Sequence, residues 1–530
     1  MRASPDLQTL PDLLRMRTRR QPDVPFVTYA DRCYTYGAFD ARTDELAGGL
    51  AELGVGAGDV VSVSLPNCLE FLEAWWAILK AGAVFSPINP AYTATEAGYV
   101  LGHSRAVAMI TNQHGAEVID PIRDGLRHLR DVVAIDAPAG SGRLGLEELA
   151  SRGSGPPVVK RGHGDLASIL YTSGTTGKPK GAMLSHQNLL VNAAQGAELV
   201  PLGPGERVGM LLPLFHANAQ VVTTLIPMLI GCEIVMWERF SASKFWAEVN
   251  HLSPVTISAV PTILAAVLSA SGAPDGPTSL RYVLCGAAPL SVELLRAFQD
   301  RFGIRILEGF GMTETGCIAS LNPYYGERKV GSIGLTLRGQ EMKIIDQESG
   351  ADAASGAYGE IVIKGPNVML GYLHNPEATA ETIKDGWLHS GDIGYMDDDG
   401  YFYIVDRTKD MIIRGGENIY PREIEEALCE HDAVLECAVI GIPDPIRGEE
   451  VLAVVVTMDG ATVDPDELAV FAAERLATYK LPKQIALRSE LPRTATGKIS
   501  KGPLRDEFGS WHTGRLMPLG EGSMGQSERR

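Results

Sequence analysis

Strand-like and helix-like segments alternate along the middle of the chain, from about residue 60 to residue 320. The first unit of this pattern is a β-branched run at Val60–Leu65, a helical stretch at Phe71–Lys80 and a second strand-like run at Ala83–Ile88. Such alternation is typical of mostly parallel sheets with helices on both faces. Seven more strands are predicted, at Val107–Thr111, Val132–Ile135, Gly209–Leu212, Glu233–Met236, Val255–Ala259, Arg281–Leu284 and Ile304–Leu307.

The pattern changes after residue 320. Glycine-rich turns and alternating segments, such as Glu360–Lys364 and Tyr401–Val405, predict a smaller antiparallel sheet. Beyond Asp410 a compact α+β unit is expected, in which Asp464 is a candidate helix N-cap and Glu467 completes a capping box. Its predicted elements are helices at Pro421–Cys429 and Pro465–Ala477 and strands at Leu435–Ile440, Val451–Thr457 and Gln484–Arg488.

The 530 residues exceed what one hydrophobic core usually serves, which is about 250–300 residues. We therefore predict an α/β protein with a large N-terminal region over residues 1–409, built from parallel α/β sheets and a β-rich annex. A small α+β C-terminal domain is expected over residues 410–510. Residues 511–530 are predicted to form a flexible tail, which from Gly520 onward is rich in Gly, Ser, Glu and Arg.

Charge and cysteine content narrow the function classes. The formal net charge is -18, whereas a nucleic-acid binder needs a basic face, so nucleic acid is not an expected partner. The seven cysteines show neither metal spacing nor a dense disulfide framework, which indicates a cytoplasmic protein. The most apolar stretch, Leu211–Trp237, is interrupted by polar residues and proline, so we expect it in the core and predict no membrane span.

The segment Tyr171–Gly181, YTSGTTGKPKG, combines glycine, hydroxyl and lysine side chains. Glycines let backbone N–H groups turn toward phosphate oxygens, and lysines supply positive charge, so a polyphosphate is the expected ligand. Thr172 and Pro179 stand where a Walker A loop needs glycine and Ser or Thr, which excludes that motif. By itself, a mobile surface loop has a similar composition. The candidate phosphate-binding residues are Thr172, Ser173, Gly174, Thr175, Thr176, Gly177 and Lys180.

This segment strongly resembles the signature loop of the adenylate-forming superfamily, which includes acyl-CoA synthetases, adenylation domains and beetle luciferases. The resemblance extends over most of the chain and implies a mobile C-terminal domain. It places the turn at 286–289 beside the adenine, and gives Thr313 a phosphate contact and Glu314 a share in holding Mg²⁺. The implied ATP-binding residues of these two segments are Gly286, Ala287, Ala288, Glu308, Gly309, Phe310, Gly311 and Thr313.

Two further segments resemble the parts of the family that recognise ribose. They imply that Asp392 binds the hydroxyls, that Arg407 assists and that Ile404 also lies at the ATP site. Ser390 replaces the commoner threonine of this pattern, a mild departure. Lys409 resembles the pivot of the family hinge, although an ordinary linker lysine would have the same sequence context.

The remaining resemblance concerns the C-terminal domain. Gly415, Gly416 and Glu417 resemble the loop that approaches the thiol in a second reaction. Pro492–Ser500 resembles the segment that carries the family's catalytic lysine, here Lys498. An ammonium on a flexible stem is suited to neutralising charge on a carboxylate and an α-phosphate as they react.

The acid pocket is expected around Phe215–Gln220, with His216, Asn218, Gln220 and Gly309 as its residues, and His216 is counted with Thr313, Glu314 and Lys498 as catalytic. In amino-acid-activating relatives the position of His216 is typically aspartate. His216 has no fixed negative charge, so an α-amino acid is disfavoured. Asn218 and Gln220 either line the pocket or satisfy buried backbone groups.

These features together predict an ATP- and Mg²⁺-dependent ligase that converts a small-molecule carboxylic acid into an acyl-adenylate and then a thioester with coenzyme A. An acyl carrier protein bearing phosphopantetheine presents the same thiol and is the alternative acceptor. A luciferase-like oxygenase and a nucleotide-binding pseudoenzyme are the less favoured alternatives. The identity of the acid and the oligomeric state stay open.

Overall fold

The structure is a computed structural model. It describes residues 7–138, 142–153, 155–157, 159–172, 178–273, 278–288, 290–407, 410–414, 417–444, 446–458, 460–493 and 499–509, with only the backbone of Arg407 and Asn418. Backbone contacts divide the chain into two compact units. The first unit comprises Met1–Ser390 and Gly394–Ile404, and the second comprises Gly391–Ile393 and Val405–Arg530.

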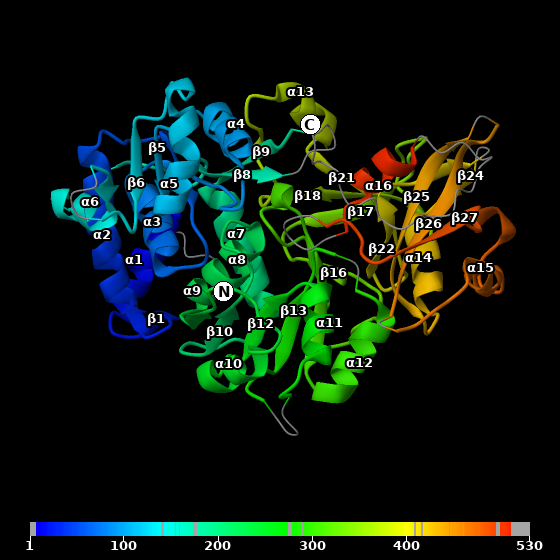
Figure 1. The fold of residues 1–530 in the computed structure, drawn as a ribbon. Coiled ribbons are helices and arrows are strands. Elements are labelled where there is room, and N and C mark those ends of the chain that lie inside the picture. The colour runs from blue at the N-terminus through cyan, green and yellow to red at the C-terminus, as the bar shows by residue number, and fades with distance from the viewer. Residues whose placement is uncertain are drawn as a thin grey trace, which may run out of the picture. The chain divides into compact units, whose positions relative to one another are not determined.

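Two large, mostly parallel sheets dominate the first unit (Figure 1). One has nine strands in the order β16-β15-β14-β13-β12-β10-β11-β1-β2, and the other has eight in the order β19-β9-β8-β4-β3-β5-β6-β7. The strands of the first are β1 (Pro25–Tyr29), β2 (Arg32–Thr35), β10 (Arg207–Met210), β11 (Glu233–Met236), β12 (Thr256–Ala259), β13 (Tyr282–Cys285), β14 (Arg305–Phe310), β15 (Ser320–Leu321) and β16 (Leu335–Thr336). The strands of the second are β3 (Val60–Ser64), β4 (Val84–Pro87), β5 (Ala108–Thr111), β6 (Asp131–Ala134), β7 (Leu144–Gly145), β8 (Leu166–Thr172), β9 (Lys180–Ser185) and β19 (Gly371–Tyr372).

Helices connect and cover these strands, as the alternating sequence predicts. They are α1 (Leu10–Arg20), α2 (Tyr36–Glu52), α3 (Leu69–Lys80), α4 (Ala94–Ser104), α5 (Gln113–Ile119), α6 (Leu146–Arg152), α7 (His186–Leu199), α8 (Ala217–Gln220), α9 (Ile226–Ile230), α10 (Phe245–Leu252), α11 (Pro261–Ser269), α12 (Val292–Phe302) and α13 (Pro376–Thr382). Shorter 3₁₀ turns lie at η1 (Asp120–Gly125) and η3 (Thr313–Thr315), and a π-helical turn lies at η2 (Val221–Leu225).

Helix α7 joins the two large sheets. It follows β9, contacts β8 and β9 of the eight-stranded sheet, and packs on η2, which in turn contacts β10 and β12 of the nine-stranded sheet. Its start is fixed by a capping box, in which the Ser185 hydroxyl accepts from the Asn188 N–H and the Asn188 side chain accepts from the Ser185 N–H. One hydrophobic core consequently includes residues from both sheets.

The predicted β-rich annex is a smaller, antiparallel sheet. Its strands are β17 (Glu341–Ile345), β18 (Gly359–Lys364), β20 (Ile383–Lys384), β21 (Trp387–Met396) and β22 (Phe402–Arg407). The order is β17-β18-β21-β20, and β22 pairs with β21.

The second unit has the predicted α+β composition. Its elements are β23 (Ile412–Arg414), β24 (Glu417–Ile419), α14 (Pro421–Cys429), β25 (Val434–Asp444), β26 (Gly448–Thr457), α15 (Pro465–Ala473), η4 (Thr478–Lys480), β27 (Gln484–Arg488) and α16 (Lys501–Phe508). The β25–β26 hairpin is central, with β23 and β27 also bonded to β26. Hydrophobic clusters pack on both faces of this sheet.

The sequence prediction was wrong in two details of this unit. Helix α15 ends at Ala473, four residues before the predicted Ala477. The Asp464 carboxylate accepts from the Asp466 N–H at 2.9 Å, whereas the Glu467 carboxylate lies 3.7 Å from His431 Nε2 instead of closing a capping box. The predicted tail, residues 511–530, lies outside the described residues.

None of the described helices is both long enough and apolar enough to cross a membrane. The apolar stretch from 211 to 237 contributes to two of the hydrophobic clusters of the first unit, as predicted.

Candidate active site

The two stems of the predicted phosphate loop are neighbouring antiparallel strands. Strand β8 ends at Thr172, and this residue pairs with Lys180 at the start of β9. The five residues between the stems that were predicted to bind phosphate, Ser173, Gly174, Thr175, Thr176 and Gly177, lie outside the described residues. The structure thus brings both ends of the loop together at one end of the paired strands β8 and β9.

Helix α4 contacts the chain on both sides of this loop. The Tyr99 hydroxyl donates to the backbone carbonyl of Pro179 at 3.1 Å, and Lys178 Nζ lies 5.9 Å from the centre of the Tyr99 ring. One turn later, His103 Nδ1 lies 2.9 Å from the hydroxyl of Tyr171, the residue before Thr172. The rings of Tyr99 and His103 stack on each other, with centres 5.4 Å apart. Two residues of α4 therefore hold the two stems.

Glu314 and the loop lysine meet through a tyrosine. The Tyr372 hydroxyl donates to Glu314 Oε1 at 2.8 Å, and Lys180 Nζ lies 5.0 Å from the centre of the Tyr372 ring. Burial raises the pKa of Tyr372, and the charge of Glu314 adds to this effect, so the hydroxyl stays a proton donor. β19, which carries Tyr372, pairs with β9, which carries Lys180.

The donor set around Glu314 fits a hard cation. Glu314 is buried, and no group of three or more His, Cys, Asp or Glu residues among the described positions forms a protein-only metal site. Mg²⁺ commonly binds one or two carboxylates together with substrate phosphates and water. A single buried carboxylate near the stem lysine of a phosphate loop is compatible with that arrangement.

The two segments predicted to contact adenine adjoin at the carboxyl ends of parallel strands. Cys285 at the end of β13 pairs with Glu308 in β14, so the turn after β13 lies beside the Gly309–Gly311 segment. A Cβ on Gly286 would lie 2.7 Å from the Gly309 carbonyl oxygen, which requires glycine. Ala287 has a positive φ of 71° and Ala288 follows it. Phe310 is half-buried, and so is Thr313 in η3.

The predicted acid-pocket residues lie at the start of α8. His216 is the N-cap residue, and its ring centre is 4.3 Å from that of Phe215. Gln220 is fully buried, and its Nε2 donates to the Leu214 carbonyl at 3.0 Å. The amide nitrogen of Gln220 therefore satisfies a buried backbone carbonyl. Asn218 Oδ1 is buried without a hydrogen-bond donor among the described residues.

The other predicted residues belong to the annex strands and the second unit. Asp392 is buried in β21, while Ile404 and Arg407 lie in β22, the strand that pairs with β21. Glu417 begins β24 and is exposed. Lys409, Gly415, Gly416 and Lys498 lie outside the described residues, as does the side chain of Arg407.

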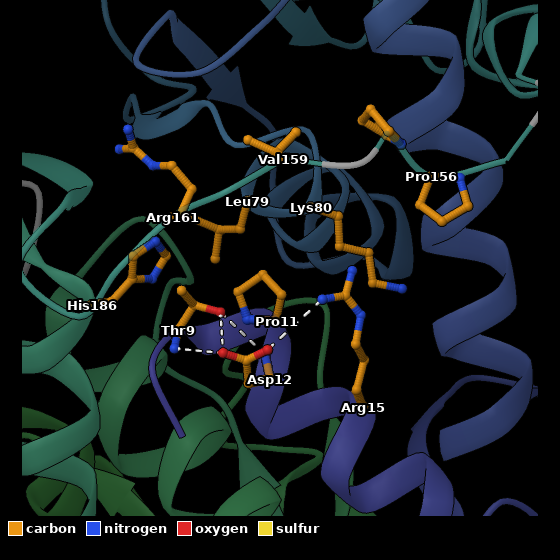
Figure 2. Close-up of a pocket in the computed structure, with 11 residues that line it drawn as sticks. Thr9, Pro11, Asp12, Arg15, Leu79, Lys80, Pro156, Val159, Arg161 and His186 are labelled. Carbon is orange, nitrogen blue, oxygen red and sulfur yellow. Dashed lines mark hydrogen bonds and ion pairs between the residues drawn. The ribbon is translucent and has the colours of Figure 1, made fainter. Parts of the chain in front are cut away.

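A cavity of about 270 Å³ lies elsewhere in the first unit (Figure 2). It is lined by α1, α3 and the start of α7, and includes Arg15, Arg161 and His186. Asp12 pairs with Thr9 in the α1 capping box and lies 3.8 Å from Arg15. None of the predicted site residues lines this cavity.

Comparison with known proteins decides the family. The model for AMP-binding enzymes matches residues 14–373, and the model for the AMP-binding enzyme C-terminal domain matches residues 423–498. This chain belongs to the AMP-binding enzyme family. A feruloyl-CoA synthase from Amycolatopsis sp. is 39% identical to the enzyme over 495 residues, which are 93% of this chain and 98% of the relative. A sulfoacetate–CoA ligase from Cupriavidus necator is 38% identical over 94% of this chain and 98% of its own length.

Solved structures agree with the enzyme in fold over nearly the whole chain. ATP-bound MatB from Rhodopseudomonas palustris has a TM-score of 0.87 and 31% identity, covering 94% of this chain and 99% of that one. The anthranilate CoA ligase AuaEII in complex with anthranoyl-AMP also has a TM-score of 0.87, with 28% identity over 94% and 97% of the two chains. The α/β fold class with a smaller C-terminal domain is therefore confirmed.

Three residues at the site were missed by the sequence analysis: Tyr99, His103 and Tyr372. All three are aromatic side chains outside the glycine-rich segments, and they reach the phosphate loop or Glu314 only through the fold. The sequence held only a weak indication of two of these residues. Tyr99 and His103 are four residues apart and thus share one face of a helix.

Proposed function

We propose that the enzyme is an AMP-forming acid–thiol ligase, which activates a small-molecule carboxylic acid with ATP and transfers the acyl group to coenzyme A. The observation that carries the proposal is the convergence of Lys180, Tyr372 and Glu314 beside the stems of the phosphate loop. Similarity to CoA ligases over both family domains supports it.

The chemistry has two steps. A carboxylate oxygen of the acid attacks the α-phosphorus of ATP, and pyrophosphate leaves from the loop that begins at Thr172. When bound, Mg²⁺ supplies charge neutralisation on the phosphate oxygens, and Glu314 would hold it. Lys498 stabilises the charge that develops between the carboxylate and the α-phosphate. The thiol then attacks the acyl carbon, and AMP leaves.

The two steps need different parts of the C-terminal domain. Lys498 acts in the first step and the 415–417 segment acts in the second, so the domain must turn between them, with Lys409 as the pivot. Asp392, Ile404 and Arg407 hold the nucleoside part of ATP in this proposal. We place the domain boundary at residues 409–410.

The acid lies near His216, Asn218 and Gly309. His216 has no fixed negative charge with which to pair a substrate ammonium, which argues against α-amino acids. The matched relatives are named for acids as different as ferulate and sulfoacetate. The side chains that line the acid pocket of this enzyme must therefore determine which acid it accepts.

Pyrophosphate release across a panel of carboxylic acids, measured with coenzyme A, with phosphopantetheinylated carrier protein or with no thiol, tests the function. We expect acid-dependent release and formation of an acyl-CoA. ATP binding without pyrophosphate release for any acid would refute the proposal, and thioester formation on the carrier protein alone would change the acceptor.

Substitution of Lys498 separates the two steps. Lys498→Ala should lower acid-dependent ATP–pyrophosphate exchange by at least ~10², the scale of losing one preorganised charge-stabilising group. Thioester formation from preformed acyl-adenylate should survive. Lys483→Ala is the matched control, because Lys483 is an exposed lysine of the same unit. An equal fall in both steps would contradict the role given to Lys498.

A further inference from the structure

Two histidines from distant parts of the first unit lie side by side. His103 is in the last turn of α4, and His374 follows the end of β19 by two residues. Their ring centres are 5.6 Å apart, and the ring planes are inclined at 71° to each other. Because the two residues are far apart in the sequence, only the fold brings these imidazoles together.

The spacing of the two rings fits a shared metal ion. Zn²⁺ binds an imidazole nitrogen at about 2.0–2.1 Å, so two imidazoles on one tetrahedral Zn²⁺ have ring centres about 5–6 Å apart. The observed 5.6 Å lies within this range. Imidazole also suits Ni²⁺ and Cu²⁺, whereas Mg²⁺ and Ca²⁺ prefer oxygen ligands. The pair therefore has the ligand chemistry of a divalent transition-metal site.

His103 is oriented as metal-binding histidines commonly are. Its Nδ1 lies 2.9 Å from the Tyr171 hydroxyl, and the Tyr99 ring stacks on its own ring with centres 5.4 Å apart. Burial raises the pKa of Tyr171, so this hydroxyl keeps its proton. When Nδ1–H donates to the tyrosine oxygen, the lone pair of Nε2 is available to a metal. Such an outer partner fixes both the tautomer and the orientation of the ring.

Protonation state and access also suit metal binding. Burial, followed by the charge of His374, lowers the pKa of His103, which favours the neutral imidazole that binds metals. Neither ring nitrogen of His374 has a hydrogen-bond partner among the described residues. His374 is exposed and His103 is half-buried, so an ion can enter from solvent. Within the described part of the chain no third His, Cys, Asp or Glu joins the pair, which leaves the other coordination positions to water.

We propose that His103 and His374 form a binding site for a divalent transition-metal ion such as Zn²⁺, which joins α4 to the segment after β19. His103 binds through Nε2, and two neutral imidazoles replace two water ligands of the hydrated ion. This site differs from the Mg²⁺ position at Glu314, and it does not rest on the proposed function.

The test measures Zn²⁺ binding by the full-length enzyme without ATP, in competition with a chromogenic chelator. We expect the unmodified enzyme to bind Zn²⁺ at this site. His103→Asn and His374→Asn should each weaken that binding at least about tenfold, because each removes one of the two protein ligands. Asparagine is chosen at 374 because it tolerates the positive φ of 52° found there. His128→Asn, at an exposed histidine, is the matched control and should bind Zn²⁺ as the unmodified enzyme does.

Two further measurements separate this site from other causes. Cys33→Ser should keep the Zn²⁺ affinity, which excludes binding at the exposed thiol. Zn²⁺ should raise the Tm of the unmodified enzyme but not that of either histidine variant. If His103→Asn does not fold, His374→Asn tests the same site at an exposed position. No Zn²⁺ binding by the unmodified enzyme, full affinity in either histidine variant, or loss of affinity in Cys33→Ser would overturn the proposal.

Discussion

Acidification below neutral pH should destabilise the enzyme, because His186 binds a proton more readily in the unfolded chain than in the folded one. His186 begins α7 beside the cavity of Figure 2, is 2% exposed, and its Nδ1 accepts from the Leu10 N–H at 3.2 Å. Burial, with a smaller effect of the Arg161 charge, lowers the pKa of His186 to about 4 from the ordinary 6.5. The folded protein therefore keeps this imidazole neutral.

The difference in proton binding between the folded and unfolded chains gives the direction and size of this loss of stability. Between pH 6.5 and pH 4 the unfolded chain binds a proton at His186 and the folded chain does not, so stability is lost as the pH falls through this window. The difference between a pKa of 6.5 in the unfolded chain and about 4 in the folded chain corresponds to about 3 kcal/mol of unfolding free energy. About 2 kcal/mol of this should be lost between pH 7.5 and pH 5.

The assay is urea unfolding at pH 7.5 and pH 5 for the unmodified enzyme and for His186→Gln. The glutamine amide can accept from Leu10 but does not titrate, so its loss of stability on acidification should be smaller by about 2 kcal/mol. His114→Gln, at an exposed position, should behave as the unmodified enzyme. An identical pH dependence for His186→Gln and the unmodified enzyme would show that His186 does not take up a proton on unfolding.

Two other substitutions probe the nucleotide side of the site. Tyr99→Phe removes the hydrogen bond to the Pro179 carbonyl, worth about 1 kcal/mol, and should raise the KM for ATP about fivefold. Tyr325→Phe, at a 76% exposed tyrosine, should leave this KM unchanged. An equal KM for ATP in the two variants would contradict the role of α4 in holding the stems of the phosphate loop. Gly311→Ala would place a Cβ 1.7 Å from the Cys317 carbonyl oxygen, so the Tm should fall by several degrees in a thermal scan, as expected for about 1–3 kcal/mol. Gly164→Ala, where the added Cβ meets open space, should keep the Tm, and a matching Tm for both variants would show that the close approach is tolerated.

The parallel sheets were predictable because each strand is a short apolar run beside an adjacent helix. Val60–Leu65 and Ile304–Leu307, for example, correspond to β3 and β14 within a few residues. The sequence did not reveal that β1 pairs with β11, with Val27 opposite Ile234, because pairing across about two hundred residues depends on the packed core and not on local propensity.

The glycine-rich parts of the site were predictable for a different reason. Gly286 and Gly309 approach each other more closely than a Cβ allows, and such constraints leave a signature in the sequence itself. Tyr372 and His103 leave none, because their roles arise from strand pairing and helix placement. The end of helix α15 at Ala473 was mispredicted because local sequence fixes helix boundaries poorly.

In the proposed reaction an acid oxygen attacks the α-phosphorus of ATP, and isotope transfer tests this step directly. An acid that supports pyrophosphate release is labelled with ¹⁸O in its carboxylate and turned over with ATP and coenzyme A. We expect one ¹⁸O atom in each AMP and none in pyrophosphate, measured by mass spectrometry. Label in a phosphate product, with ADP in place of AMP, would contradict it.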